Sequence, residues 1–218
     1  MTKLRLRYSK TDRAKYISHL DLSATMRRAF IRAGLELEYS KGFNPHPYVS
    51  VAIPLSVGSQ SVCELMDVGL KERVETVGLK EKITECLPDG LRISEAYYPE
   101  RKFSDLMWLE ISGILYYDSN KLPDISKRLT ERFAMDCIEV EKKTKRGVSV
   151  VNIAAHILDL EFEGIDEVII KAKLSAQEPT IKPENLLDSL KGDFEMLAPD
   201  HAAFKRIEVF DSDMTVFR

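Results

Sequence analysis

The chain has 218 residues, of which 44% are hydrophobic and 31% are charged, and it carries a formal net charge of −3. This balance is typical of a folded globular protein and excludes a disordered chain. No apolar run approaches the roughly 20 residues needed to cross a bilayer, and no signal-peptide pattern opens the chain. The three cysteines, Cys63, Cys86 and Cys137, are far apart and odd in number, which favours reduced thiols. We therefore expect a cytoplasmic protein without a membrane segment.

The first hundred residues predict alternating strands and helices. The expected elements are a strand at 3–8, a helix at 18–33, a short strand at 35–39, strands at 48–54 and 61–70, a helix at 76–86 and a strand at 91–98. Apart from the short extra strand, this order is the β-α-β-β-α-β of a ferredoxin-like sandwich.

The helix at 18–33 has the clearest local signals. Ser18 is a suitable N-cap, and Asp21 follows it at the spacing of a capping box. Gly34 suits the position just after the helix. The apolar residues at helical spacing predict the buried stripe, and they are Leu22, Met26, Ala29, Phe30 and Ala33. His19 falls in the first turn, next to backbone N–H groups that can bind an anion.

The segment from Tyr39 to Pro47 reads Y-S-K-G-F-N-P-H-P and predicts a stiffened loop. Pro45 and Pro47 fix their own φ angles and push the residue before each of them into an extended conformation. The loop therefore presents Phe43, Asn44 and His46, which supply an apolar ring, an amide and an imidazole. Loops held on a rigid scaffold are common sites of binding and catalysis.

The second half predicts a similar order of elements. They are a strand at 106–117, a helix at 121–133, a strand at 137–145, a strand-rich segment at 148–162, a strand at 167–175, a short helix at 183–190 and a strand at 202–210. We predict an α+β protein made of tandem ferredoxin-like (βαββαβ) sandwiches with antiparallel sheets, at residues 1–99 and 105–218. The tandem rests on the order of elements, because no repeated sequence indicates a duplication.

Charge is distributed unevenly along the chain. Residues 1–48 hold ten Lys and Arg against four Asp and Glu, a net charge of +6, so the remaining residues carry −9. A second basic run, Lys142-Lys-Thr-Lys-Arg146, lies in the acidic half. Such asymmetry indicates a polyanionic partner, usually nucleic acid, with an ordinary solvated surface as the alternative. We therefore expect the cations of the first 48 residues to share one outward surface, which gives the domain at residues 1–99 a basic face.

The sequence contains no Cys-x-x-Cys, no His-x-x-x-His and no glycine-rich phosphate loop. We therefore assign no metal site and no cofactor.

Several of these motifs resemble the radical SAM-linked protein family, a domain of unknown function that occurs alone or fused behind radical SAM domains. The matching segments are Leu4–Arg7, Tyr16–Asp21, Arg27-Arg28, Arg32–Gly34, Tyr39–Pro47 and Pro54–Gly58, with Ser61 and Glu64. Residues 145–153 resemble a later basic motif more loosely, and Asn152 stands where the family often has an acid. The resemblance implies a radical SAM enzyme as partner and no established activity. A fainter likeness, at the level of fold, is to the tandem ferredoxin-like RNA-processing proteins of CRISPR systems.

The first functional hypothesis is a non-catalytic RNA-binding module that presents a substrate to a radical SAM partner. Arg27, Arg28, Arg32 and Lys41 would contact phosphates, and Phe43 would stack on an unpaired base. Asn44 and His46 would hold a base edge or the backbone, and His19 and Asp21 would support them. The phosphate track would continue over Lys142, Lys143, Lys145 and Arg146.

Two alternatives remain open from the sequence. One is a metal-independent endoribonuclease in which His19 or His46 is the general base and Arg28 or Lys41 stabilises the transition state. The other is a protein-interaction module that docks a radical SAM enzyme without nucleic acid.

Overall fold

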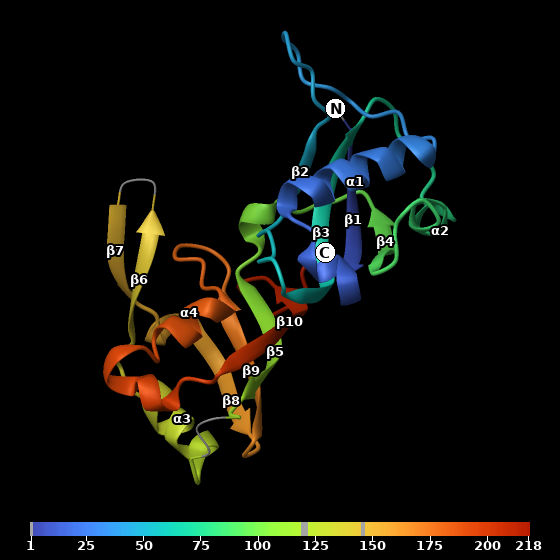
Figure 1. The fold of residues 1–218 in the computed structure, drawn as a ribbon. Coiled ribbons are helices and arrows are strands. Elements are labelled where there is room, and N and C mark those ends of the chain that lie inside the picture. The colour runs from blue at the N-terminus through green and yellow to red at the C-terminus, as the bar shows by residue number, and fades with distance from the viewer. Residues whose placement is uncertain (1, 119–121, 145–146) are drawn as a thin grey trace. The chain divides into compact units, whose positions relative to one another are not determined.

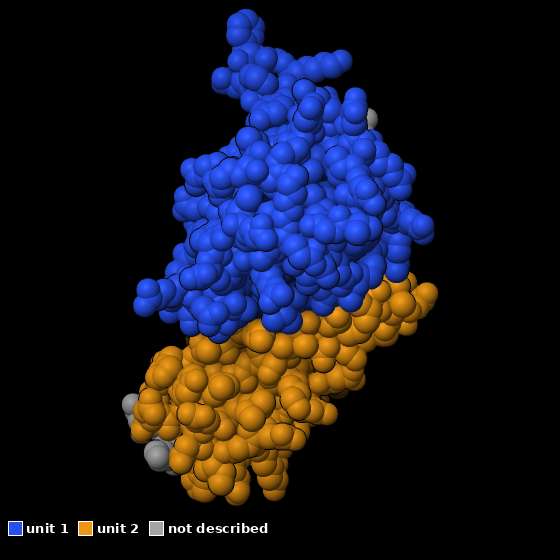
Figure 2. Space-filling model, turned by 90° about the vertical axis from the view of Figure 1, so that its right-hand side faces the viewer, with its two compact units in different colours: residues 1–103, 218 blue, residues 104–217 orange. Residues whose placement is uncertain are grey.

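The computed structural model describes residues 2–118, 122–144 and 147–218. The chain divides into two compact units, Met1–Phe103 with Arg218, and Ser104–Phe217 (Figure 2). Both units are mixed α+β and their strands pair in antiparallel fashion, as predicted. Within the described part of the chain, we find no helix with the length and apolar character to cross a membrane.

Unit 1 contains four strands and two α-helices in the predicted order (Figure 1). They are β1 (Thr2–Lys10), α1 (His19–Arg32), β2 (Val49–Val51), β3 (Gln60–Leu70), α2 (Leu79–Thr84) and β4 (Leu91–Tyr97), with a 3-10 turn at Asp12–Tyr16. The order in the sheet is β4-β1-β3-β2. Leu37 and Tyr39, in the expected extra strand, make only isolated bridges, to Leu70 and Pro47.

Helix α1 begins and ends where its local signals predict. The Ser18 side chain accepts a hydrogen bond from the Asp21 backbone N–H at 3.2 Å and donates one to the Asp21 carboxylate at 2.7 Å. Gly34 follows the helix with φ +77°, a conformation that favours glycine. All five residues of the predicted apolar stripe are buried, and four of them, Leu22, Met26, Phe30 and Ala33, join the core over β1 and β3.

Strand β1 exposes Lys3 but buries its other three cations, although the sequence predicted an exposed basic face. It lies between β3 and β4 and is buried from Leu4 to Tyr8. Arg5 is 1% exposed and pairs with Asp67, Nε to Oδ1 at 2.7 Å and Nη2 to Oδ2 at 3.0 Å. Lys10 is 2% exposed, and Arg7 is also buried. The expectation that the cations of residues 1–48 share one outward surface is therefore wrong for these three.

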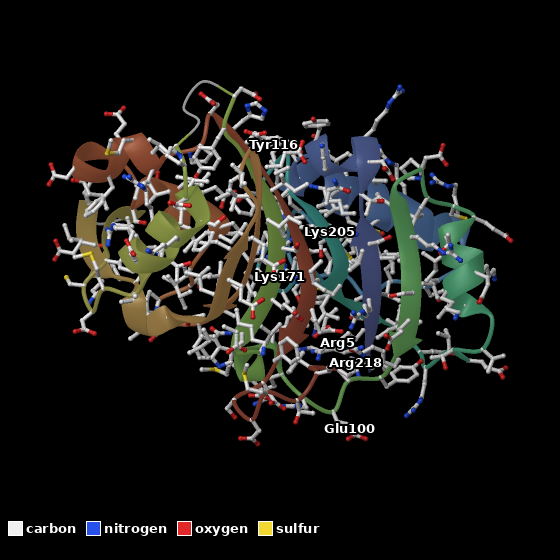
Figure 3. The ribbon with its side chains drawn as sticks, turned by 90° about the horizontal axis from the view of Figure 1, so that it is seen from below. Arg5, Glu100, Tyr116, Lys171, Lys205 and Arg218 are labelled. Carbon is white, nitrogen blue, oxygen red and sulfur yellow. The ribbon has the colours of Figure 1, made fainter. Side chains whose placement is uncertain are left out.

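The chain ends against this part of unit 1. Arg218 Nε lies 3.3 Å from Glu95 Oε2 on β4. Figure 3 labels both Arg5 and Arg218 among the side chains of the unit. Their positive charges lower the pKa of Tyr97, but burial has the larger effect and raises that pKa above its ordinary value.

Unit 2 builds its sheet from four strands and carries a separate hairpin. Its elements are β5 (Trp108–Tyr116), α3 (Ile125–Phe133), β6 (Glu139–Thr144), β7 (Gly147–Asn152), β8 (Ile157–Glu163), β9 (Glu167–Ser175), α4 (Pro183–Asp188) and β10 (His201–Phe210). The strand order is β10-β5-β9-β8, and β6 pairs only with β7 among the described residues. The predicted strand at 137–145 thus belongs to the hairpin, and β8 pairs with β9 in the main sheet.

The assignment of Ser18 as the N-cap of α1 can be tested by substitution. Replacing Ser18 with Ala removes the acceptor of the Asp21 N–H, so we expect the free energy of unfolding to fall by about 1 kcal/mol. Urea denaturation would measure this difference. Ser23→Ala, within the same helix, is the matched control and should change stability by less than about 0.5 kcal/mol. Equal effects of the two substitutions would contradict the assigned cap.

Candidate nucleic-acid interface

The segment that connects α1 to β2 in the chain extends away from unit 1, and we call residues 35–48 the projection. Its outgoing and returning halves are its two arms. Figure 1 shows it as a long light-blue pair of segments reaching beyond the sheet. Both arms are bonded to the same residue of β3: Glu38 N donates to Gly69 O at 2.9 Å, and Gly69 N donates to Tyr48 O at 2.7 Å. The arms also bond each other, with Tyr48 N donating to Glu38 O at 3.0 Å.

The tip of the projection is closed by Ser40 and His46. Ser40 N donates to His46 O at 2.9 Å, and His46 N donates to Ser40 Oγ at 3.1 Å. His46 Nδ1 lies 3.0 Å from Ser40 Oγ and 3.3 Å from Asn44 O. These contacts occupy Nδ1, so Nε2 is the ring nitrogen left to face a ligand. Together with Pro45 and Pro47, they restrict the conformations of the tip.

The side chains at the tip point into solvent. Phe43 has a relative exposure of 108%, and Lys41, Asn44 and His46 are also exposed. Burying such an apolar side chain is worth about 1.5–3 kcal/mol relative to leaving it in water. A fully exposed phenyl ring on a braced loop therefore indicates a contact surface rather than a part of the core.

The predicted phosphate contacts on α1 differ in their availability. Arg32 Nη2 donates to Cys86 O at 2.5 Å, and the half-buried Arg27 donates from Nε to Ser23 O at 3.3 Å. Arg28 is exposed, and no residue in the described part of the chain bonds its guanidinium. Among the predicted phosphate contacts of unit 1, Arg28 and Lys41 are thus the most open to a phosphate.

His19 and Asp21 lie away from the projection along the helix. They belong to the first turn of α1, whereas the projection follows its last turn. The 14 residues of α1 span roughly 21 Å at 1.5 Å per residue. The structure therefore does not bring His19 and His46 into one site. Asp21 serves the N-cap of α1 rather than the tip.

The second basic run lies in the hairpin of unit 2. Lys142 and Lys143 belong to β6, and Lys145 and Arg146 lie outside the described residues. The Lys142 ammonium donates to Thr180 O. Burial lowers the pKa of Lys142, and the positive charge of Lys182 lowers it further. Lys142 is therefore held against its own unit.

Sequence reasoning missed a second surface at the start of α1, formed around Lys10. Lys10 Nζ donates to Ile17 O at 2.8 Å and to Lys15 O at 3.2 Å, while Gly58 N donates to Lys15 O at 2.9 Å. These bonds join the Tyr16–Asp21 and Pro54–Gly58 motifs. The two joined segments carry three exposed apolar side chains, and we call Tyr16, Leu20 and Val57 the α1-start patch. The sequence offered one signal for this surface, because both segments are among those that resemble the radical SAM-linked family.

Comparisons with known proteins bear on the family and the fold. Residues 3–183 match the family described as "Uncharacterized protein conserved in bacteria (DUF2344)". No match is found among curated protein sequences.

Among solved structures, the chain is similar to one in the crystal structure of a Cbf5-Nop10-Gar1 complex, with TM-score 0.50 and 10% identity. That match covers 94% of this chain and 48% of the other, so this chain spans about half the length of its structural relative. A crystal structure of an unknown protein from Galdieria sulphuraria matches with TM-score 0.27 and 12% identity, over 94% of this chain and 98% of that one.

The closure of the tip leads to a prediction about local mobility. Ser40→Ala removes the acceptor of the His46 N–H, so we expect that amide to exchange with solvent about fivefold faster, as for the loss of about 1 kcal/mol. Hydrogen exchange followed by NMR measures this rate. Ser50→Ala, an exposed serine on β2, is the control and should leave the rate unchanged. Unaltered exchange in Ser40→Ala would mean that the prolines alone fix the tip.

Proposed function

Since the chain belongs to the family described as uncharacterized protein conserved in bacteria, which supplies no activity, we propose a function from the geometry of unit 1. The protein is a non-catalytic RNA-binding module that presents single-stranded RNA to a radical SAM enzyme. The projection holds the RNA, and the partner enzyme carries out the chemistry. The family resemblance supports the choice of partner, and the side chains of the projection support the choice of RNA.

The observation that carries this proposal is the full exposure of Phe43 at a braced tip. Base stacking on an aromatic ring is worth about 1–3 kcal/mol per base, and it needs a ring face that is open to solvent and held in place. A base within a duplex cannot reach a single projecting ring without leaving its stack, so an unpaired segment is the better match.

Two exposed cations support a polyanionic ligand. Lys41 lies two residues from Phe43 at the tip, and Arg28 lies on α1 with its guanidinium open to a phosphate. His46 Nε2 and the Asn44 amide add polar groups at the same tip, which suit a base edge or a ribose hydroxyl.

We also propose that both units are ferredoxin-like sandwiches. In unit 1 the strands lie in the sheet as β4-β1-β3-β2, so the fourth strand of the chain is at one edge and the second is at the other. Unit 2 repeats it, as β10-β5-β9-β8, once the β6–β7 hairpin is set aside as an insertion. The antiparallel pairing throughout supports this arrangement.

Docking of a protein without RNA is the second candidate, and the α1-start patch favours it. Leu20 is 79% exposed, Tyr16 is 65% exposed and Val57 is 61% exposed. Apolar side chains gathered in this way mark contact surfaces more often than singly scattered ones do. Under the main proposal this patch receives the enzyme, while the projection holds the RNA.

Phe43 provides the first test of RNA binding. We expect Phe43→Ala to weaken binding of an unstructured single-stranded RNA by about 5- to 150-fold, because one stacked base is lost. Fluorescence anisotropy at low salt measures the affinity. Phe43→Tyr keeps the ring face and should bind like the unchanged protein, and Val77→Ala removes another highly exposed apolar side chain elsewhere in unit 1. Absence of any RNA binding by the unchanged protein would refute the proposal and leave protein docking.

The salt dependence provides a second test, directed at the phosphate contacts. The double variant Arg28→Ala, Lys41→Ala should reduce the slope of log K against log salt by about 1.4, at about 0.7 per phosphate contact on a single strand. Melting temperature should stay nearly constant, because both side chains are exposed. Lys71→Ala is the control, since Lys71 already pairs with Glu36 at 3.4 Å. An unchanged slope would place the phosphates elsewhere.

A further inference from the structure

The β6–β7 hairpin of unit 2 has an unpaired edge along β7. Among the described strands, β7 pairs only with β6, and the two form a sheet of their own. Figure 1 shows β6 between β7 and the remainder of unit 2. The outer side of β7, at residues 148–150, therefore presents backbone N–H and C=O groups that another strand can bond.

Strand β7 carries no charged residue, unlike the other long strands at a sheet edge. Strand β4 contains Arg92 and Glu95, strand β8 contains three acidic residues, and β6 contains both lysines and glutamates. Charged side chains at an edge discourage pairing with a further strand. The sequence of β7 is Gly-Val-Ser-Val-Val-Asn, in which Val148 is 60% exposed and Val150 is 59% exposed. This edge thus lacks the usual protection against pairing.

The two faces of the hairpin have different surroundings. Val151 packs against the core of unit 2 and pairs with the buried Val140 of β6. Side chains alternate between the faces of a strand, so Val148 and Val150 share the opposite face, where Val150 pairs with the exposed Glu141. One face therefore anchors the hairpin to its unit, and the other carries exposed valines beside the unpaired edge.

The pattern Val148-Ser149-Val150 is complementary to a second copy of itself. When two β7 strands pair antiparallel around a twofold axis at Ser149, Val148 of each chain lies opposite Val150 of the other. Two valines from each chain then form one apolar cluster on the same side of the joined sheet. A shift of one residue would place a valine opposite Ser149 and turn the two valine faces to opposite sides. The pattern therefore favours this single register.

We propose that the protein self-associates through β7 into a twofold-symmetric dimer. The two hairpins join into one antiparallel sheet in the order β6-β7-β7-β6. A two-stranded hairpin is only marginally stable in water, and a sheet of twice as many strands with an apolar cluster is more stable. The contact is short, so the association is weak and depends on protein concentration. It uses only residues of unit 2 and is independent of the RNA contact at Phe43.

Sedimentation equilibrium of the full chain at low salt tests this dimer. We expect self-association between about 10 μM and about 1 mM, as suits a small interface. Ser149→Lys places two ammonium groups directly opposite each other, so it should weaken association at least about fivefold. Ser149→Glu should do the same with two carboxylates. An equimolar mixture of the two variants should associate again, because opposite charges then face each other across the axis.

Ser50→Lys is the matched control. Ser50 is also an exposed serine between two valines, in β2, but Val49 and Val51 are half-buried against the core of unit 1. This substitution should leave the association unchanged. Val150→Thr keeps the branched shape and should weaken association by about 2- to 30-fold, because two symmetric pairs lose an apolar partner. It reports on the same contact if Ser149→Lys alters the circular dichroism spectrum.

The outcomes separate the possibilities. A monomer at every concentration up to about 1 mM would overturn the proposal. Equal losses in Ser50→Lys and Ser149→Lys would also overturn it, as would a mixture of Ser149→Lys and Ser149→Glu that stays monomeric. RNA binding measured on Ser149→Lys reports separately on the Phe43 surface.

Discussion

The backbone of Gly69 holds the projection to unit 1, and the proposed function depends on that attachment. Its carbonyl accepts from one arm at Glu38, and its N–H donates to the other arm at Tyr48. β3 is paired along its length with β1, so this residue is fixed by the sheet rather than by the loop. The tip thereby combines an exposed aromatic ring with a restricted backbone. A ring that is already in position loses less conformational entropy when a base stacks on it.

Local signals predicted much of the fold because they depend on residues that are close in sequence. Ser18, Asp21 and Gly34 determine the ends of α1 through short-range hydrogen bonds and backbone conformation, and the structure confirms those ends. The stiff tip was likewise predictable from two prolines. Strand and helix order followed from periodicity, and the antiparallel α+β class followed from that order.

Charge was the property that the sequence could not place. Arg5 and Lys10 counted toward the basic balance of the first 48 residues, yet Arg5 pairs with Asp67, 62 residues away, and Lys10 bonds backbone carbonyls. Such burial depends on which strands become neighbours, and no local pattern encodes that. The same reason applies to the pairing of β6. Its sequence predicted a strand but could not show whether that strand joined the main sheet. The partly buried Lys142 near Lys182 depends in turn on how β6 packs against α4.

The two units place their distinctive segments at the same point in the chain order. In unit 1 the projection connects the first helix, α1, to the second strand of the sheet, β2. In unit 2 the β6–β7 hairpin connects α3 to β8, which holds the corresponding position in the sheet. An insertion at this connection adds side chains without altering the order of the four main strands, so the sheets can stay alike while the insertions diverge. One insertion exposes an aromatic ring, and the other helps to form a groove against α4 that is lined by both lysines and carboxylates. Differences in ligand between the units should therefore follow these insertions, and exchanging the two segments should exchange binding properties while both sheets remain folded.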